Sequence, residues 1–345
     1  MKVYDCYPTY LGCKRALAVD IIKKIKEMYP NTKTIVDAFG GSGAISITAI
    51  QMGLNALYNE KTERVARAIK YLANGNFDDI TTFMSYDEYW DNVVSNNILN
   101  NSDCFKVSFM YNFPGRGNCY IIPDDEFKNF RILLQKFVCK DSDPQLLYPF
   151  LNDNFHSIIN ELYSIEKPII ERYNDIMPIL KKLFLISKHN LYQYFNASID
   201  ELKKISFKML QNIVGDAEAA YILKMCRIYP IEKITFLRNH KYIDFSKMEI
   251  SNKDAFDLDL SKYDPETTVL YFDPPYKNTA KSGNYTDFDS NILPLLFDKF
   301  KQFPIFLSEY SSNVEGLQEI YTKSIPHFNG KEYAKEVLYF KSPLR

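Results

Sequence analysis

The stretch TIVDAFGGSGAISITAI, residues 34–50, contains a short β-branched run, a glycine-rich turn and the start of a helix. Thr34 to Val36 predicts a strand, and Ala44 to Ile50 predicts a helix. Between them, Gly40, Gly41 and Gly43 form a turn that lets a ligand approach the backbone closely at the N-terminus of the helix. A simple tight turn would have the same composition, so the turn by itself leaves both interpretations open.

The next segment continues the same alternation of strand and helix. Residues 54–58 predict a second strand that closes at Asn59 and Glu60, and residues 61–72 carry apolar side chains at helical spacing. This order is typical of one half of a doubly wound α/β sheet. Such sheets use a carboxylate at the end of the second strand to hold ribose hydroxyls, which makes Glu60 a candidate. A solvated charge at a helix N-terminus is the alternative for Glu60.

The stretch TVLYFDPPY, residues 268–276, is the second informative segment. Residues 268–272 predict a buried strand, and Pro274 and Pro275 can neither continue a central strand nor enter a helix interior. The strand must therefore end at Asp273. It leaves a carboxylate, a carbonyl and the ring of Tyr276 at its carboxyl end, where open α/β sheets bind their ligands.

Residues 76–242 have a different pattern, with amphipathic helical stretches separated by polar joints. The predicted helices are Tyr86–Leu99, Asp125–Cys139, Lys181–Ile186 and Ile199–Ile213. Structureless connections longer than about 15 residues are uncommon, so we expect a second domain here. We therefore predict an α/β domain formed by residues 1–75 and 243–345, with strands also at residues 304–308 and 336–340. A mainly helical domain, residues 76–242, is inserted into it.

Composition excludes several classes of protein. The chain has 345 residues, of which 46% are hydrophobic and 25% charged, as in ordinary globular proteins. The formal net charge of −1 argues against a protein that coats nucleic acid, but not against an enzyme with a local basic cleft. No apolar run reaches about 18 residues and the N-terminus carries charges throughout, so we expect a cytoplasmic protein without a membrane span. The six cysteines and four histidines show no metal-ligand spacing, so no metal is expected.

Asp273-Pro274-Pro275-Tyr276, taken with the Phe39-x-Gly41-x-Gly43 turn, resembles the amino-methyltransferases that use S-adenosylmethionine. The N-terminal segment Tyr10-Leu11-Gly12-Cys13-Lys14 narrows the resemblance to the Dam-type DNA adenine-N6 methyltransferases. Their motifs occur in the order seen here, and Asn252–Phe256 resembles the family's Asp-Phe element. The resemblance covers about residues 7–75 and 240–340. It departs at Cys13, where many relatives have glycine, and at Ala255, which separates Asp254 from Phe256.

The resemblance implies a Rossmann-like doubly wound methyltransferase sheet with an inserted, mainly helical target-recognition domain. The implied activity is site-specific methylation of the N6 amine of an adenine flipped out of double-stranded DNA, with S-adenosylmethionine as cofactor. The implied catalytic residues are Asp273, Pro274 and Tyr276. The implied cofactor-binding residues are Tyr10, Lys14, Asp37, Phe39, Gly41, Gly43, Glu60, Asp254, Phe256 and Asp273. A surface lysine is the alternative for Lys14, and a helix or turn cap is the alternative for Asp254.

The segment FPGRGN, residues 113–118, predicts a glycine-rich turn with an arginine at its tip. Arg116 and Asn118 are therefore candidates for DNA contact, and Arg116 could read a guanine edge. An ordinary exposed turn is the alternative. A cognate restriction endonuclease is a further candidate partner, if the context is restriction–modification rather than a phage or an orphan modifier. Alternative functions are methylation of RNA adenine or of cytosine N4, and a catalytically silent nucleic-acid-binding subunit with the same fold.

Overall fold

The computed structural model describes residues 3–8, 13–77, 80, 83–94, 100–112, 120–194, 198–275, 292–310, 317–326 and 333–344. The chain divides into two compact units. The sheet unit comprises Met1–Gly75, Ile98–Cys119 and Asn239–Arg345. The helical unit comprises Asn76–Asn97 and Tyr120–Arg238.

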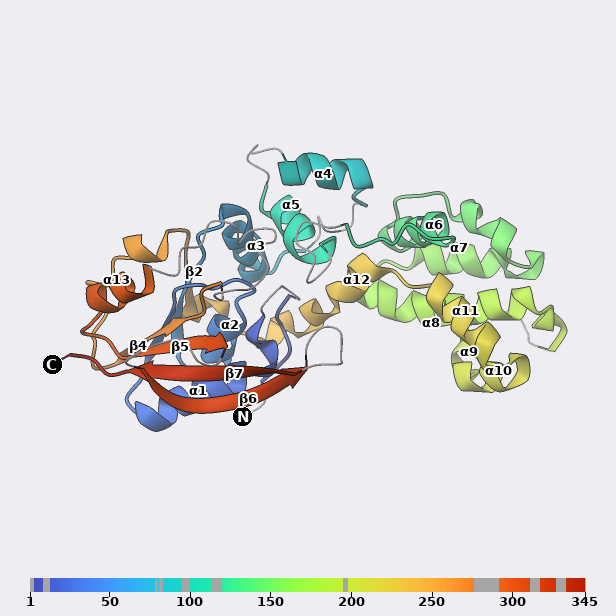
Figure 1. Ribbon diagram of the computed structural model, residues 1–345. Helices are drawn as coiled ribbons and strands as arrows, with labels where there is room; N and C mark the ends of the chain where they lie inside the picture. Colours follow the sequence, from blue (N-terminus) through green and yellow to red (C-terminus); the bar gives the residue numbers. More distant parts are fainter. Residues whose placement is uncertain are drawn as a thin grey trace. The chain divides into compact units, whose positions relative to one another are not determined.

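The described residues of the sheet unit form a mixed α/β fold around a seven-stranded sheet (Figure 1). The strands are β1 (Thr34–Asp37), β2 (Asn55–Asn59), β3 (Met248–Ser251), β4 (Thr268–Phe272), β5 (Ile305–Tyr310), β6 (Gln318–Pro326) and β7 (Tyr333–Lys341). Their order across the sheet is β3-β2-β1-β4-β5-β7-β6. The first five in this order are parallel, and β7 is antiparallel to both β5 and β6. The arrangement is consistent with a Rossmann-like fold.

Helices of the sheet unit connect and cover these strands. They are η1 (Lys14–Ala16), α1 (Ala18–Met28), α2 (Ala44–Gln51), α3 (Glu63–Asn74), α5 (Asn101–Phe105), η3 (Lys106–Met110), η8 (Phe245–Lys247), η9 (Ala255–Asp257) and α13 (Ile292–Lys299). The central strand β4 is buried along its whole length, as expected for a parallel strand with both faces covered. The predicted strands and helices around the glycine turn and before Asp273 are therefore confirmed.

Successive side chains of a strand point to opposite faces of the sheet, so each face has its own set of side chains. On one face, Val36, Leu270 and Leu307 form a core with Leu296 and Phe300 from the region of α13. This core packs the strands that carry the candidate site against a helix on the far side of the sheet. The opposite face is the one on which polar side chains gather at the carboxyl ends of the strands.

The segment after residue 98 belongs to the sheet unit, although the sequence placed it in the inserted domain. Helices α5 and η3 have buried apolar side chains and pack against α3, where the rings of Tyr71 and Phe105 have centroids 5.4 Å apart. Arg67 Nε also donates to Asn101 Oδ1 over 2.9 Å. The boundary predicted at residue 242 differs as well, since Asn239 begins the last segment of the sheet unit. Amphipathic helices in sequence do not indicate which unit their apolar face covers.

The described residues of the helical unit are mainly helices. These are α4 (Tyr86–Val94), α6 (Lys128–Cys139), η4 (Pro144–Phe150), η5 (Asp153–Phe155), α7 (His156–Ser164), α8 (Ile169–Lys188), η6 (Leu191–Tyr194), α9 (Ile199–Lys204), α10 (Phe207–Val214), α11 (Asp216–Met225) and α12 (Tyr229–Lys233), and η7 (Thr235–Tyr242) runs from this unit into the sheet unit. The predicted helix over residues 199–213 is two helices, because Ser206 Oγ accepts a hydrogen bond from Met209 N–H and begins a new one. None of the helices in the described part of the chain combines the length and the apolar character needed to cross a membrane.

Arg172 of α8 organises the interior of the helical unit, where only 2% of its surface is exposed. Its guanidinium donates to the carbonyls of Val138 (2.7 Å), Phe137 (3.2 Å) and Tyr163 (3.0 Å), and also to that of Ile165. These carbonyls lie at the carboxyl ends of α6 and α7, where a helix leaves its last carbonyls without partners. One side chain thus completes the hydrogen bonding of two helix ends.

We predict that Arg172→Met lowers the free energy of unfolding of the helical unit by about 2 kcal/mol or more. The substitution leaves buried carbonyls without donors, and each such group costs about 1–3 kcal/mol. Urea unfolding followed by circular dichroism measures the change. Arg227→Met is the matched control, because Arg227 is half-exposed and pairs with Glu232 at the surface. Equal stability of the two variants would contradict the role given to Arg172.

Candidate functional site

Three acidic side chains lie at or directly after the carboxyl ends of adjacent strands. Asp37 ends β1, Glu60 follows β2, and Asp273 follows β4. Strand β1 pairs in parallel with both neighbours, and Asp37 is level with Tyr58 and Tyr271. The carboxyl ends of parallel strands meet at one edge of a sheet. The fold therefore brings together predicted site residues that are more than two hundred positions apart in the chain.

The glycine turn between β1 and α2 is closed by backbone hydrogen bonds. Gly43 N–H donates to the Gly40 carbonyl (2.8 Å), and Gly40 N–H donates to the Asn59 carbonyl at the end of β2 (2.7 Å). Gly41 and Gly43 have φ angles of 48° and 74°, which residues other than glycine rarely adopt. A Cβ on Gly40 would lie 2.2 Å from a ring carbon of Tyr58. Backbone conformation and lack of space thus both require glycine in this turn.

Glu60 is fixed beside the glycine turn. Its Oε2 accepts a hydrogen bond from Gly41 N–H (3.0 Å), and its Oε1 accepts one from Thr62 N–H (2.8 Å). Burial raises the pKa of Glu60, while the hydrogen bonds from Thr62 and Gly41 oppose the shift. The residue is only partly buried. Each carboxylate oxygen can accept a further hydrogen bond, so a ligand beside the turn would find a fixed acceptor.

Asn59, at the end of β2, joins two loops of the site, a role that no sequence pattern indicates. Its side chain is fully buried, and its Nδ2 donates to the carbonyls of Ala38 and Lys253, each over 3.0 Å. Lys253 N–H in turn donates to Asn59 Oδ1 over 3.1 Å. The amide therefore ties the glycine turn after β1 to the loop after β3. An asparagine at a strand end is common enough that only the structure identifies this one.

Asp37 is almost completely buried, with 1% of its surface exposed. Its Oδ2 accepts a hydrogen bond from Ser46 Oγ of α2 (2.8 Å). Burial raises the pKa of Asp37 to about 7, and the negative charges of Asp273 and Glu60 contribute in the same direction against the Ser46 hydrogen bond. Asp37 is therefore partly protonated near neutral pH, and a nearby cation would favour its ionised form.

Lys14 pairs with Asp273 in the interior and is not the surface lysine that the alternative interpretation required. Lys14 Nζ lies 2.8 Å from Asp273 Oδ1 and 3.1 Å from Glu336 Oε1, and 6% of Lys14 is exposed. Burial alone would lower the pKa of Lys14, but the charges and hydrogen bonds of Asp273 and Glu336 raise it above its ordinary value. The ammonium therefore stays charged. Glu336 was not among the predicted site residues.

The N-terminal segment lies against α2 and the glycine turn. Ser42 Oγ donates to Cys13 Sγ (3.0 Å), so the cysteine that departs from the family pattern contacts the turn directly. Thr48 Oγ1 of α2 donates to Tyr7 Oη over 3.2 Å. Cys13 lies directly before η1, so its contact with Ser42 helps to place Lys14 opposite Asp273.

Asp254 has the capping role that was its alternative interpretation. It accepts a hydrogen bond from Phe256 N–H (2.9 Å) at the start of η9 and pairs with Lys61 Nζ (2.9 Å). Partial burial opposes these contacts, but together they lower the pKa of Asp254. The ring of Phe256 is 41% exposed, with Lys299 Nζ 4.9 Å from its centroid. Phe39 is partly buried and meets the ring of Phe272 edge to face at 5.9 Å.

Four predicted site residues lie outside the described residues. They are Tyr10, Arg116, Asn118 and Tyr276. Their roles in cofactor binding, DNA contact and stacking stay predictions from the sequence.

Among the residues that the structure describes, negative charge exceeds positive charge around Lys14. Asp273 and Glu336 contact it directly, and Asp37 and Glu60 are close enough for their charges to act on one another. Taking such charges out of water without equal compensation is unfavourable. A ligand with positive charge and hydroxyl groups would reduce the repulsion and satisfy acceptors at this edge of the sheet.

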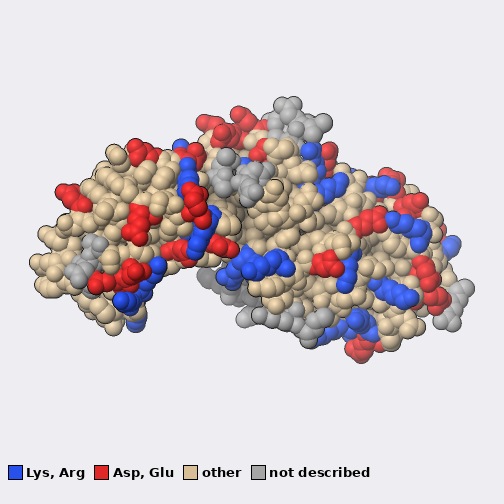
Figure 2. All heavy atoms as spheres, turned by 180° about the vertical axis from the view of Figure 1, so that it is seen from behind, with Lys and Arg blue, Asp and Glu red and all other residues tan. Residues whose placement is uncertain are grey.

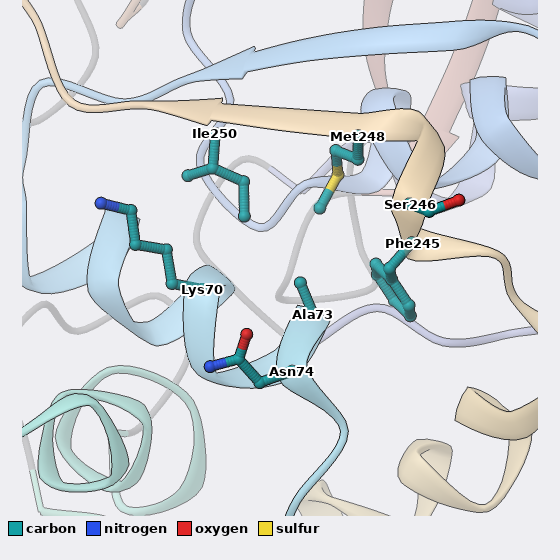
Figure 3. Close-up of a pocket in the computed structure, with 7 residues that line it drawn as sticks. All are labelled: Lys70, Ala73, Asn74, Phe245, Ser246, Met248 and Ile250. Carbon is teal, nitrogen blue, oxygen red and sulfur yellow. The ribbon is translucent and has the colours of Figure 1, made fainter.

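An open cavity of about 320 Å³ lies between α3 and β3, away from the acidic strand ends. Figure 3 shows Met248 and Ile250 directed from β3 towards Ala73 of α3, with Phe245 at one end. Its lining is mixed, with apolar and polar side chains, and contains none of the acidic residues at the strand ends. Its polar lining residues are Lys70, Asn74 and Ser246, and none of the site residues predicted from the sequence is among them.

Surface charge does not mark a face for nucleic acid in the view of Figure 2. Lysine and arginine side chains are interspersed there with aspartate and glutamate. The pattern agrees with the formal net charge of −1 for the chain.

No model of a known protein family matches the chain, and a search of curated proteins found no match. The functional conclusion therefore depends on the geometry of this site and on the motifs in the sequence.

The raised pKa of Asp37 predicts how stability depends on pH. The unfolded chain loses the Asp37 proton near the ordinary pKa of 3.8, whereas the folded protein keeps it until about pH 7. Folding thus favours the protonated form, so this contribution to the free energy of unfolding is complete below about pH 4 and lost as the pH rises to about 7. Asp37→Asn has no proton to lose and should gain stability relative to wild type across this interval.

Chemical unfolding of wild type and Asp37→Asn at several pH values between about 4 and 7.5 measures the effect. Asp298→Asn serves as the control, because the Asp298 side chain is exposed and pairs with Lys301 at the surface. A difference between wild type and Asp37→Asn that does not change with pH would show that Asp37 has an ordinary pKa.

Proposed function

We propose that the protein is a site-specific DNA methyltransferase that transfers a methyl group from S-adenosylmethionine to the N6 amine of adenine. The observation that carries the proposal is the position of Asp273 and Pro274. This pair directly follows the fully buried β4, beside β1 and its glycine turn. Lys14, from the N-terminal motif of the resemblance, contacts Asp273. Two motifs that are far apart in the chain thus meet at one place.

The residues at the strand ends fit S-adenosylmethionine. Gly41 and Gly43 leave the backbone of the turn open to a ligand. Glu60 offers acceptors for ribose hydroxyls, in the position where nucleotide-binding sheets use a carboxylate. The excess of carboxylates complements the positive sulfur and amino group of the cofactor. Asp37 lies behind the turn, so it would act on these groups through its charge.

The remaining cofactor contacts follow from the resemblance. Tyr10 and Lys14 would lie near the methionine part, with Phe39 in the turn beneath it. Asp254 and Phe256 would bracket the adenine of the cofactor. The exposed ring of Phe256 supports this assignment, because an apolar surface of this kind can stack on a base.

The N6 amine of adenine is a weak nucleophile, so the protein must activate it for methyl transfer. When bound, S-adenosylmethionine supplies a methyl group activated by its positively charged sulfur. The lone pair of the adenine amine is conjugated into the ring. Hydrogen bonds from N6–H to the Asp273 carboxylate and the Pro274 carbonyl localise that lone pair on nitrogen. In direct transfer the bond from N6 to the methyl carbon would form as the sulfur–methyl bond breaks, which leaves the neutral thioether. The extra proton on N6 would pass to the Asp273 carboxylate and then to solvent. No covalent enzyme intermediate is needed, so alignment of the reacting groups supplies much of the remaining rate.

The target adenine must leave the duplex to reach such a site. Flipping costs on the order of a few kcal/mol, and stacking of the base on the ring of Tyr276 would offset part of this cost. The helical unit would recognise the target sequence, with Arg116 and Asn118 as candidate contacts.

Several lysines of the helical unit have partners within the protein. Lys182 Nζ donates to the Leu202 carbonyl (2.7 Å), and Lys188 pairs with Glu218 (2.8 Å). Because the net charge of the chain is near zero, its affinity for DNA must come from a local set of cations and should fall as the salt concentration rises.

Transfer of tritiated methyl groups tests the proposal against its alternatives. The purified protein is incubated with labelled S-adenosylmethionine and either duplex DNA or RNA, and the product nucleosides are then separated. Labelled N6-methyladenine in DNA supports the proposal. Label in RNA adenine or cytosine N4 supports the neighbouring enzyme classes. Binding of nucleic acid without transfer supports a silent subunit.

We predict that Asp273→Asn lowers the rate of methyl transfer by about 100-fold or more, as expected when a group that acts on the transition state is removed. An amide is a weaker acceptor than a carboxylate for N6–H. Single-turnover transfer to duplex DNA measures the rate. Asp298→Asn is the control, because its side chain is 78% exposed on α13. A rate within twofold of wild type would remove Asp273 from the catalytic role.

We predict that Glu60→Ala weakens the binding of S-adenosylmethionine by about 1.5–3 kcal/mol, the range for a hydrogen bond to a charged group. The dissociation constant should rise about tenfold to 150-fold in titration calorimetry. Glu63→Ala is the matched control, because Glu63 is an exposed glutamate three residues away at the start of α3. If both variants bind the cofactor as wild type does, Glu60 serves only to close the glycine turn.

A further inference from the structure

Two carboxylates from different strands share the Lys14 ammonium. Lys14 Nζ lies 2.8 Å from Asp273 Oδ1 and 3.1 Å from Glu336 Oε1. The side chains of Asp273 and Glu336 are only 15% and 9% exposed. The proposed chemistry uses Asp273, and the resemblance puts Lys14 near the cofactor. Neither the proposed chemistry nor the resemblance gives a role to Glu336, which lies on β7.

The register of the sheet explains why these groups meet. Leu307 and Tyr339 are paired residues of β5 and β7, and both belong to the core beside α13. Glu336 is three residues from Tyr339 and therefore faces the opposite side. On that side Tyr271 Oη and Ser308 Oγ are 2.6 Å apart, and Asp273 is two residues beyond Tyr271. Because these side chains are largely buried, water does little to screen the charges of Lys14, Asp273 and Glu336 from one another.

A second carboxylate changes what Lys14 does to Asp273. If the buried ammonium had one carboxylate as its partner, it would neutralise most of the charge of that carboxylate and occupy the best acceptor positions of the carboxylate oxygens. When Glu336 shares the ammonium, the three groups together keep a net charge of about −1, and Asp273 keeps part of it. Both acceptors also hold Nζ in place, so the position of Asp273 is fixed from β7 as well as from its own strand.

We propose that Glu336 is a positioning residue for methyl transfer, which acts through Lys14 to hold Asp273 in place and to leave its charge only partly neutralised, so that Asp273 can accept from the target amine. This inference rests on the proposed function. It assigns to the antiparallel strand β7 a part in the chemistry that the motifs place on β4.

Charge-removing and charge-keeping variants of the full-length protein test the inference. Glu336→Gln keeps the shape of the side chain and removes its charge, whereas Glu336→Asp keeps the charge. The measurements are the single-turnover rate of transfer to duplex DNA at saturating S-adenosylmethionine, cofactor affinity by calorimetry, and thermal unfolding. Glu319→Gln, at an exposed position on β6, is the control.

We expect Glu336→Gln to transfer at least tenfold more slowly, with cofactor affinity within twofold of wild type. Glu336→Asp should recover part of the rate, and Glu319→Gln should match wild type. A rate within twofold of wild type for Glu336→Gln overturns the inference. So does a loss of cofactor affinity as large as the loss of rate, because Glu336 would then support the cofactor site.

A double-mutant cycle separates an effect through Lys14 from a general loss of stability. In the background of Lys14→Met, no buried ammonium needs a partner, and Glu336→Gln should change the transfer rate by less than twofold. The same fold-change in both backgrounds overturns the inference. If Glu336→Gln alone fails to fold, Glu336→Asp takes its place in the cycle, and its effect on the rate should likewise disappear in the Lys14→Met background. Absence of transfer by wild type refutes the proposed function and this inference together, whereas wild-type transfer with an unaffected Glu336→Gln refutes only the inference.

Discussion

The parallel pairing of β1 between β2 and β4 is the constraint on which the candidate site depends. The register sets Asp37 level with Tyr58 and Tyr271, so the chain leaves all three strands at the same edge. The glycine turn, Glu60 and Asp273 follow from those strand ends within a few residues. A slip of one residue in either pairing would turn the side chains of a strand to the opposite face. The register is held by the core on the far face, where Val36 and Leu270 pack with α13.

The same edge carries buried charges that do not favour stability. Asp37 has a pKa raised to about 7, first by burial and then by its acidic neighbours. Lys14 is charged because Asp273 and Glu336 surround it, against the effect of its own burial. Buried ion pairs of this kind often contribute little to folding compared with apolar side chains of similar volume. Their concentration where ligands bind in α/β sheets points to function, since perturbed pKa values cluster at functional sites.

Backbone-directed hydrogen bonds make this edge rigid. Asn59 joins the loops after β1 and β3, and Glu60 joins the glycine turn to the start of α3. Asn252 Nδ2 adds bonds to the carbonyls of Glu60 (2.7 Å) and Lys61 (3.0 Å). A site built on such ties holds its side chains more closely than free loops would.

The sequence predicted the strands of the sheet interior and missed its two edges. Apolar runs such as residues 268–272 mark strands that are buried on both faces. Strands β3 and β6 lie at the two edges of the sheet and carry polar residues such as Glu249 and Lys323, so no apolar run marks them. Edge strands of this composition are common because they resist pairing with other chains. The predicted domain boundary differs from that of the structure for a related reason. The apolar face of α5 could pack in either unit, and its contact with α3 places it in the sheet unit.

By itself, the sequence determined the glycine turn, the end of β4 at Asp273 and the carboxylate after β2. In each case the local chemistry of glycine, proline or a strand end leaves few alternatives. Tertiary structure alone decided that Lys14 is shared by Asp273 and Glu336, that Asp37 is buried behind the turn, and that Asn59 joins two loops. Such contacts depend on strand order and register. These are set by the packing of the whole sheet, and no local pattern of residues records them.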